Sequence, residues 1–213
     1  MNESLSPAPQ NCRDVLVAVD VQNDFITGSL AVTNGELVIA PLNKLATDVR
    51  GHGGQVIVTR DHHPETTPHF DTWPVHCVAG TPGAEFHPAL DVQTGDIVIS
   101  KGMGQTDGYS GMEGYDLESG VTLEQLLRPE RADEHVRVML GGLATDFCVR
   151  ATLLDIAKTF RGDERVRTYL VRDAVRAVNL KPGDEAEALS AMEAAGAIAL
   201  TSREIREDFY GTV

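Results

Sequence analysis

One cysteine of this 213-residue chain lies in a setting that suits nucleophilic chemistry. Cys148 follows Gly141-Gly142 and the residues Leu-Ala-Thr-Asp-Phe, between a predicted strand and a predicted helix. With Thr145 as N-cap, Cys148 lies in the first helical turn, where free N–H groups and the helix dipole favour a thiolate and can bind an oxyanion. The pattern indicates a nucleophile for acyl transfer. The competing interpretation is an inert buried cysteine.

Two charged residues at the ends of other predicted strands are candidates for proton transfer. Asp20 ends the apolar run 15–19, and a carboxylate at the edge of a sheet has a raised pKa that suits a general base. Lys101 follows the run 96–100 and can hold a carboxylate or a developing negative charge. Taken alone, Asp20 can equally cap the following loop, and Lys101 can be an ordinary solvated lysine.

The histidines are concentrated in one loop, which indicates a metal site. Five of the seven lie between His62 and His87. Asp61 and His63 are two apart on an extended segment, so their side chains point to the same side, and His69 and His87 come from the same loop. A carboxylate with imidazoles suits Zn²⁺, with Fe²⁺ and Mn²⁺ as alternatives. The other interpretation is a polar loop whose hydrogen-bonded histidines bind no ion.

Alternating strands and helices must bring these residues together. The sequence pattern predicts strands over 15–19, 55–59, 96–100, 136–140, 167–171 and 197–200, and helices over 34–49, 149–160 and 182–195. Residues 14–213 are therefore predicted to form a single α/β domain, Rossmann-like, with a mostly parallel sheet of about six strands and helices on both faces. Asp20, Lys101 and the cysteine turn then share the carboxyl edge of the sheet, where such folds bind ligands.

The composition disfavours several classes of protein, including those that bind nucleic acid or span a membrane. Eighteen basic and thirty-two acidic residues give a net charge of -14, which disfavours nucleic acid and anionic membranes as partners. No apolar run approaches the roughly 20 residues of a membrane span. Residues 1–13 lack the apolar core of a signal peptide and are predicted to be a disordered leader. Three scattered cysteines make no disulfide framework, so we expect a cytoplasmic protein.

Several short segments along the chain form a set that a known family shares. They are Asp20-Val-Gln-Asn-Asp-Phe25, Thr59-Arg-Asp-His-His63, Trp73-Pro-Val-His-Cys77 with the residues up to Gly83, Glu85-Phe-His-Pro88, Lys101-Gly102, Tyr109-Ser-Gly111 and Gly142-Leu-Ala-Thr-Asp-Phe-Cys-Val149. The set resembles nicotinamidases (pyrazinamidases), a group within the isochorismatase-like cysteine hydrolases. The resemblance runs over nearly the whole chain from about Val15.

The resemblance implies a role for each chemical group. It implies a catalytic triad of Asp20, Lys101 and Cys148. It also implies a site for one divalent ion, zinc before iron or manganese, at Asp61, His63 and His87 with His69.

The resemblance also implies how the substrate is held. Phe25, Trp73 and Tyr109 would line the pocket around a pyridine ring, with Leu143 beside them. A cis peptide bond between Leu143 and Ala144 would direct the N–H of Ala144, with that of the cysteine, at the oxyanion.

The implied reaction is hydrolysis of nicotinamide to nicotinate and ammonia through a thioester on Cys148, a step of NAD salvage. Pyrazinamide is expected as a further substrate, and homo-oligomerisation is left open. One alternative is a related hydrolase of another small amide, such as maleamate or a carbamoyl amine, which would not need the ion. A second is a non-enzymatic sensor of metal or thiol oxidation.

Overall fold

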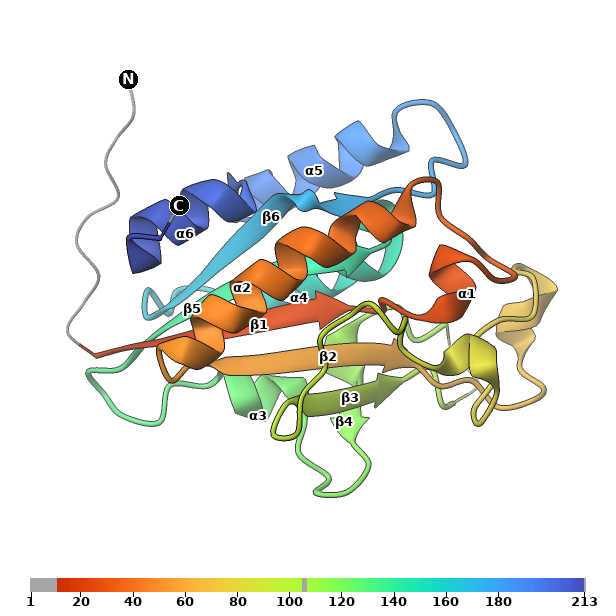
Figure 1. The fold of residues 1–213 in the computed structure, drawn as a ribbon, viewed down its shortest axis with the longest axis horizontal. Coiled ribbons are helices and arrows are strands. Elements are labelled where there is room, and N and C mark those ends of the chain that lie inside the picture. The colour runs from red at the N-terminus through yellow and green to blue at the C-terminus, as the bar shows by residue number, and fades with distance from the viewer. Residues whose placement is uncertain (1–10, 105–106, 213) are drawn as a thin grey trace.

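The computed structural model describes residues 11–104 and 107–212. Its sheet has seven strands in the order β4-β3-β2-β1-β5-β6-β7, and every neighbouring pair is parallel except β3 with β4 (Figure 1). The strands are β1 (Cys12–Val19), β2 (Gln55–Asp61), β3 (Ile97–Lys101), β4 (Tyr115–Asp116), β5 (His135–Leu143), β6 (Val166–Arg176) and β7 (Ile198–Leu200). The helices are α1 (Asn23–Ile26), α2 (Ile39–Gly51), α3 (Leu123–Leu127), α4 (Arg150–Thr159), α5 (Asp184–Ala194) and α6 (Ser202–Tyr210).

The predicted α/β fold with a mostly parallel sheet is confirmed. The strand beyond the six predicted is β4, an antiparallel edge strand of two residues that is too short to show an alternating pattern. The helix expected over 34–49 begins as α2 at Ile39, after a 3-10 turn at Gly35–Val38. Leu37 belongs to that turn and is half exposed, so it does not face the core as the helical spacing suggested.

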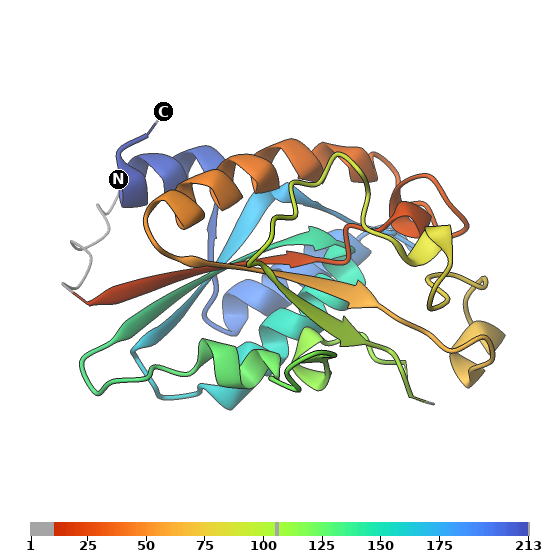
Figure 2. The same cartoon turned by 60° about the horizontal axis from the view of Figure 1, so that its bottom comes forward.

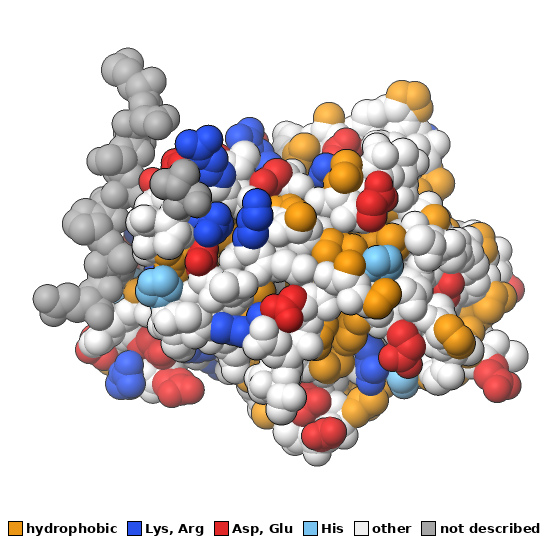
Figure 3. Space-filling view, viewed as in Figure 1, with side chains coloured by type: hydrophobic (Ala, Val, Ile, Leu, Met, Phe, Trp, Pro, Cys, Tyr) orange, Lys and Arg blue, Asp and Glu red, His pale blue; other side chains and the backbone are white. Residues whose placement is uncertain are grey.

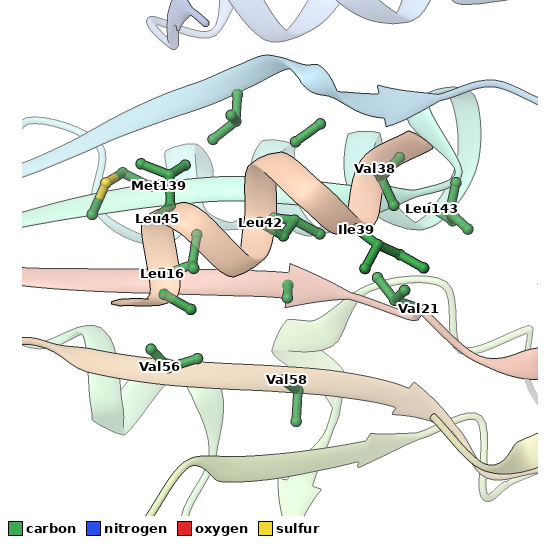
Figure 4. Packing of buried hydrophobic residues seen from close by; sticks show 14 of the residues in the cluster. Leu16, Val21, Val38, Ile39, Leu42, Leu45, Val56, Val58, Met139 and Leu143 are labelled. Carbon is green, nitrogen blue, oxygen red and sulfur yellow. The ribbon is translucent and has the colours of Figure 1, made fainter. Parts of the chain in front are cut away.

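Helices cover both faces of the sheet (Figure 2). Helices α2 and α6 lie on one face, and α3, α4 and α5 lie on the other. Figure 4 shows how Leu42 and Leu45 of α2 pack toward Leu16, Val56 and Met139 of the central strands. Truncating one such buried leucine to alanine costs about 2–5 kcal/mol, so these contacts hold the strands that carry the site in place.

The first strand begins earlier than the sequence suggested. Cys12 and Arg13 pair with β5, and the Arg13 guanidinium lies 3.1 Å from a carboxylate oxygen of Glu134. The predicted leader 1–13 therefore extends two residues too far, because its last residues have partners in the sheet. Residues 1–10 lie outside the described residues. No helix in the described part of the chain is long and apolar enough to cross a membrane.

Acidic and basic side chains are mixed on the face of the molecule shown in Figure 3. The net charge of -14 is thus not gathered into one acidic patch on that face. The expectation that nucleic acids and anionic membranes are not partners stays a prediction.

The strand order brings the candidate residues to one edge of the sheet. The chain moves from β1 outward through β2 and β3, and β5 then lies on the opposite side of β1. Such a reversal opens a crevice beyond the carboxyl ends of parallel strands. Asp20 directly follows β1, Asp61 ends β2, Lys101 ends β3, and Cys148 follows β5. The fold therefore gives all four side chains access to the same crevice.

Candidate functional site

A buried lysine joins the residues predicted to do chemistry. Lys101 Nζ lies 2.8 Å from Asp20 Oδ2, 3.5 Å from Cys148 Sγ and 2.5 Å from Asp61 Oδ1. It also donates to the backbone oxygen of Gly108 at 3.2 Å. All four side chains at the centre of this group are buried. Lys101 is thus a buried ion-pair partner of two carboxylates rather than an ordinary solvated lysine.

Burial sets the charge states of the three predicted catalytic groups. It raises the pKa of Asp20, with Lys101 opposing, and it raises the pKa of the Cys148 thiol in the same way. Burial acts to lower the pKa of Lys101, but Asp20 and Asp61 outweigh it, and the pKa lies well above its usual value. The cysteine therefore rests as a thiol beside a basic carboxylate and an ammonium group. Burial therefore favours the thiol, whereas the helix dipole was expected to favour the thiolate.

Asp20 is held by the neighbouring strand β2. Its backbone N–H donates to Thr59 O at 3.1 Å, and the Thr59 hydroxyl donates to Asp20 Oδ1 at 2.6 Å. The residue has a left-handed backbone, with φ 51°, which turns the chain out of β1. One carboxylate oxygen is thus bound by Thr59, and the other faces the lysine.

Cys148 lies in a π-helical turn over Thr145–Val149 that begins after a cis peptide bond between Leu143 and Ala144. The cis bond confirms what the family resemblance implied. The N–H groups of Phe147 and Val149 both donate to Ala144 O at 3.1 Å. Ala144, with its extended backbone, occupies the N-cap position. The prediction of Thr145 as N-cap is wrong, since Thr145 is already inside the turn and its buried hydroxyl has no hydrogen-bond partner among the described residues.

Three buried histidines form a compact cluster next to the lysine. His63, His69 and His76 each offer a ring nitrogen, and these nitrogens lie within 4.8 Å of one another. Asp61 Oδ2 lies 3.7 Å from His63 Nε2 and 3.9 Å from His76 Nε2. A carboxylate and three imidazoles at this spacing are a donor set for a divalent transition-metal ion.

The other ring nitrogens of these histidines bind oxygen atoms. The acceptors are Gly102 O at 2.9 Å from His63 Nδ1, Asp107 Oδ1 at 2.9 Å from His69 Nδ1 and Pro74 O at 2.7 Å from His76 Nδ1. An Nδ1–H that donates in this way leaves the lone pair of Nε2 for a metal ion. Within the described chain, His63 Nε2 is buried and has no hydrogen-bond partner. The residues therefore fit a bound ion.

His87 is not brought into this cluster. It is half-buried, and its Nδ1 accepts the N–H of Ala89 at 3.2 Å in a local turn. The cluster contains His76, which was not predicted as a ligand, whereas Asp61, His63 and His69 lie together as expected. The signal for His76 was its position in the Trp73-Pro-Val-His76 segment.

Asp61 belongs to both groups of residues. Its Oδ1 faces Lys101 and its Oδ2 faces the histidines. Burial acts to raise the pKa of Asp61, but Lys101 and His63 outweigh it and hold the pKa below its usual range. The carboxylate is therefore charged, and it links the cysteine group to the histidine group.

Aromatic side chains line a cavity beside both groups. Phe25, Trp73 and Tyr109 contribute to its wall, as the sequence analysis expected, and Trp73 Nε1 donates to the Tyr109 hydroxyl at 2.9 Å. Cys148 and Ala144 also reach the cavity. Leu143 is buried in the core, and its neighbour Ala144, rather than Leu143 itself, belongs to the described lining of the cavity.

Four apolar residues of this wall were not predicted from the sequence. They are Leu30, Val32, Phe147 and Val178. The ring of Phe147 packs against Trp73, with centroids 4.9 Å apart, and against Tyr109 at 5.7 Å. The position of Phe147 next to the predicted nucleophile was the available signal. The other three lie in loops whose paths the sequence did not reveal.

The sequence and the fold of this chain are similar to those of known proteins. The isochorismatase domain model matches residues 14–204. A nicotinamidase/pyrazinamidase of Mycobacterium tuberculosis is 42% identical over 151 residues, which cover 67% of this chain and 78% of that protein. The pyrazinamidase of Pyrococcus horikoshii in complex with zinc has a TM-score of 0.74 and 36% identity, covering 89% of this chain and 99% of the other. PnC1 from L. infantum in complex with nicotinate has a TM-score of 0.75 and 31% identity. This match covers 93% of this chain and 96% of the other.

Proposed function

Because this chain belongs to the isochorismatase domain family, we propose that it is a cysteine amidohydrolase that converts nicotinamide to nicotinate and ammonia. The observation that carries the proposal is the buried contact of Lys101 with Asp20 and Cys148 beside an aromatic cavity. Relatives named as nicotinamidases, at 32–42% identity, support the choice of substrate. The Mycobacterium tuberculosis relative is also named pyrazinamidase, as is the Pyrococcus horikoshii protein, and these names support pyrazinamide as a further substrate.

The contacts support a two-step mechanism. Asp20 takes the proton of the Cys148 thiol, and the sulfur attacks the carboxamide carbon. The C–N bond breaks, Asp20 returns the proton to the departing ammonia, and a thioester remains. Water then attacks the thioester carbonyl and Asp20 accepts its proton. The C–S bond breaks, Asp20 returns that proton to the sulfur of Cys148, and nicotinate leaves as its carboxyl proton goes to solvent. Lys101 stays protonated throughout and offsets the negative charge of the carboxylates.

We assign the oxyanion hole to backbone groups of the cysteine turn. The N–H groups of Ala144 and Cys148 are the donors that we propose for the negative oxygen of each tetrahedral intermediate. The support is the position of both residues in the cavity wall.

The histidine cluster is the proposed site for one divalent ion. Asp61, His63, His69 and His76 would hold it, and the ion, when bound, would supply a Lewis acid for the pyridine nitrogen. Zinc is the ion that we propose, because three imidazoles and a carboxylate suit it and because the Pyrococcus horikoshii pyrazinamidase was solved with zinc. Iron and manganese suit the same donors.

Ammonia release from nicotinamide tests the proposed function. The zinc-loaded protein should release ammonia and nicotinate in equal amounts, and Cys148→Ala should abolish turnover while the far-UV and near-UV circular dichroism stay unchanged. The smaller alanine removes the nucleophile without adding bulk to the buried turn. Turnover of a few per cent or more in the folded Cys148→Ala variant would remove Cys148 from its role. Turnover of maleamate or a carbamoyl amine but not of nicotinamide would favour the related hydrolase.

A further inference from the structure

Gln22, just before α1, and Asp24, in its first turn, are polar side chains that bind the backbone of the metal loop. Gln22 is fully buried. Its Nε2 donates to Asp61 O at 2.9 Å and to Ala84 O at 2.8 Å, and its Oε1 accepts the N–H of Asp61 at 2.8 Å. Both N–H groups and the carbonyl oxygen of this side chain are therefore used.

Gln22 thus binds Asp61 as a neighbouring strand would, through the N–H and the C=O of the same residue. These bonds act at the last residue of β2, beyond which the loop with the histidines begins. They fix the backbone from which the Asp61 carboxylate projects. The direction of that carboxylate decides whether one oxygen faces Lys101 while the other faces the histidines.

Asp24 binds a second segment of the loop, next to His76. Its Oδ2 accepts the N–H of Cys77 at 2.7 Å, and its Oδ1 accepts the N–H of Ser29 at 3.2 Å. Cys77 directly follows His76 and has a left-handed backbone, with φ 46°, a conformation that non-glycine residues rarely adopt. The bond from Asp24 stabilises this conformation. Cys77 O in turn accepts the N–H of His63 at 3.0 Å, so the segment connects two histidines of the cluster.

We propose that Gln22 and Asp24 are positioning residues of the metal centre, which set its affinity for the ion by fixing the backbones of Asp61 and Cys77. The proposal rests on the metal site of the proposed function. It explains why two polar side chains next to the catalytic Asp20 point toward the metal loop rather than into the cavity. Loss of groups that orient metal ligands typically weakens metal binding about 10- to 100-fold.

A purely structural role would lower stability without changing affinity, and two matched residues provide the controls. Asn43 bridges backbone groups as Gln22 does, by donating to Ala89 O at 2.8 Å and accepting the N–H of Asp91 at 2.9 Å. Asp173 binds the N–H and the hydroxyl of Ser202, both at 2.6 Å. Neither control residue binds the backbone of a metal ligand or of its neighbour.

The test is a zinc titration of the full chain in competition with a chromophoric chelator, without substrate. Gln22→Met and Asp24→Ala should weaken Zn²⁺ binding about 10- to 100-fold. Asp24→Asn should keep most of the affinity, because its amide oxygen can still accept the N–H of Cys77. Asn43→Met and Asp173→Ala should lower the unfolding temperature of the metal-free protein but leave the zinc affinity unchanged.

Unchanged zinc affinity in Asp24→Ala, with circular dichroism showing a folded protein, would overturn the inference, and so would an equal loss in the two control variants. If Gln22→Met fails to fold, the comparison of Asp24→Ala with Asp24→Asn decides the question. A parent protein that binds no zinc would overturn both the metal site and this inference. Because the titration contains no nicotinamide, its result is independent of whether that amide is hydrolysed.

Discussion

Asp20 must be both basic and close to the sulfur for the proposed mechanism to operate. Burial raises the pKa of its carboxyl, while Lys101 and the Thr59 hydroxyl keep the charged form accessible. A general base works best when its pKa lies near the working pH. These opposing contacts suit Asp20 to accept a proton from a thiol whose own pKa is raised by burial.

The raised pKa of Asp20 predicts where kcat/KM falls on the acidic side of its pH profile. The free enzyme is active only while Asp20 is deprotonated, so kcat/KM should fall as the pH drops through the raised pKa. The pH at the midpoint of this fall should therefore lie above about 3.9, the pKa of an unperturbed aspartate. The measurement is kcat/KM for nicotinamide against pH, with zinc content checked at each pH. A midpoint at or below the unperturbed value in fully zinc-loaded protein would contradict the assignment of Asp20 as the base.

At the scale of single elements, β1 and β5 approach so closely that one position tolerates only glycine. Gly142 has φ 123°, and a Cβ at this position would lie 2.1 Å from Val19 O. Val19 directly precedes Asp20, and Gly142 lies two residues before Ala144. The glycine therefore sets the distance between the strand that carries the base and the turn that carries the nucleophile.

Gly142→Ala should consequently damage both stability and catalysis. The unfavourable backbone and the clash with Val19 should together lower the free energy of unfolding by roughly 2–6 kcal/mol. Urea unfolding measures this loss. The surviving folded fraction should also turn over nicotinamide more slowly, since Asp20 and Cys148 are displaced. Gly53→Ala is the matched control: Gly53 also has a positive φ, but a Cβ there meets nothing within 4 Å, so only the backbone cost of about 1–2 kcal/mol remains. Equal losses in both variants would show that the close approach does not matter.

The elements also show what the sequence could reveal. The buried strands β1, β2, β5 and β6 were predictable, because parallel strands covered on both faces are continuous apolar runs. Helices α3 and α6 were missed although each begins with a capping box, Thr122 with Gln125 and Thr201 with Glu204. Helix α3 is only five residues long, and α6 is mostly polar, with an apolar face limited to Ile205, Phe209 and Tyr210.

Some residues of the site could likewise be predicted from the sequence and others could not. Asp20, Lys101 and Cys148 were predictable because the ends of parallel strands share an edge. The choice of His76 over His87 was not, because it depends on the path of a long loop without periodic structure. That path is set by distant contacts such as the bond from Asp24 to the N–H of Cys77.

At the scale of the whole molecule, the proposed ion connects the end of β2 with the long loop that follows it. Asp61 and His63 come from the strand end, whereas His69 and His76 come from the loop. An ion that binds only the folded chain stabilises it, by about 2.7 kcal/mol when its free concentration is 100 times its dissociation constant. Removal of the ion should therefore lower the stability of the whole domain.

Thermal unfolding with and without a chelator tests this coupling. It also distinguishes His76 from His87 as a metal ligand. The chelator should lower the unfolding temperature of the parent protein. His76→Ala should already unfold at the lower temperature and should respond little to the chelator. His87→Ala should respond as the parent does, because His87 Nδ1 only accepts the N–H of Ala89. The reverse result for the two variants would restore His87 as a ligand in place of His76.

The cysteine group and the histidine group, joined through Asp61, are proposed to act on one substrate in one cavity. The most direct test compares kcat/KM for nicotinamide and for benzamide, which lacks the ring nitrogen, in zinc-loaded parent protein and in His76→Ala. Loss of the nitrogen contact leaves the amide poorly aimed at Cys148, and a misplacement of about 1 Å can cost roughly 100-fold in rate. Benzamide should therefore be a poorer substrate of the parent protein by about that factor, and His76→Ala should lose most of the discrimination together with most of the activity. Comparable kcat/KM values for the two amides in the zinc-loaded parent would contradict the claim.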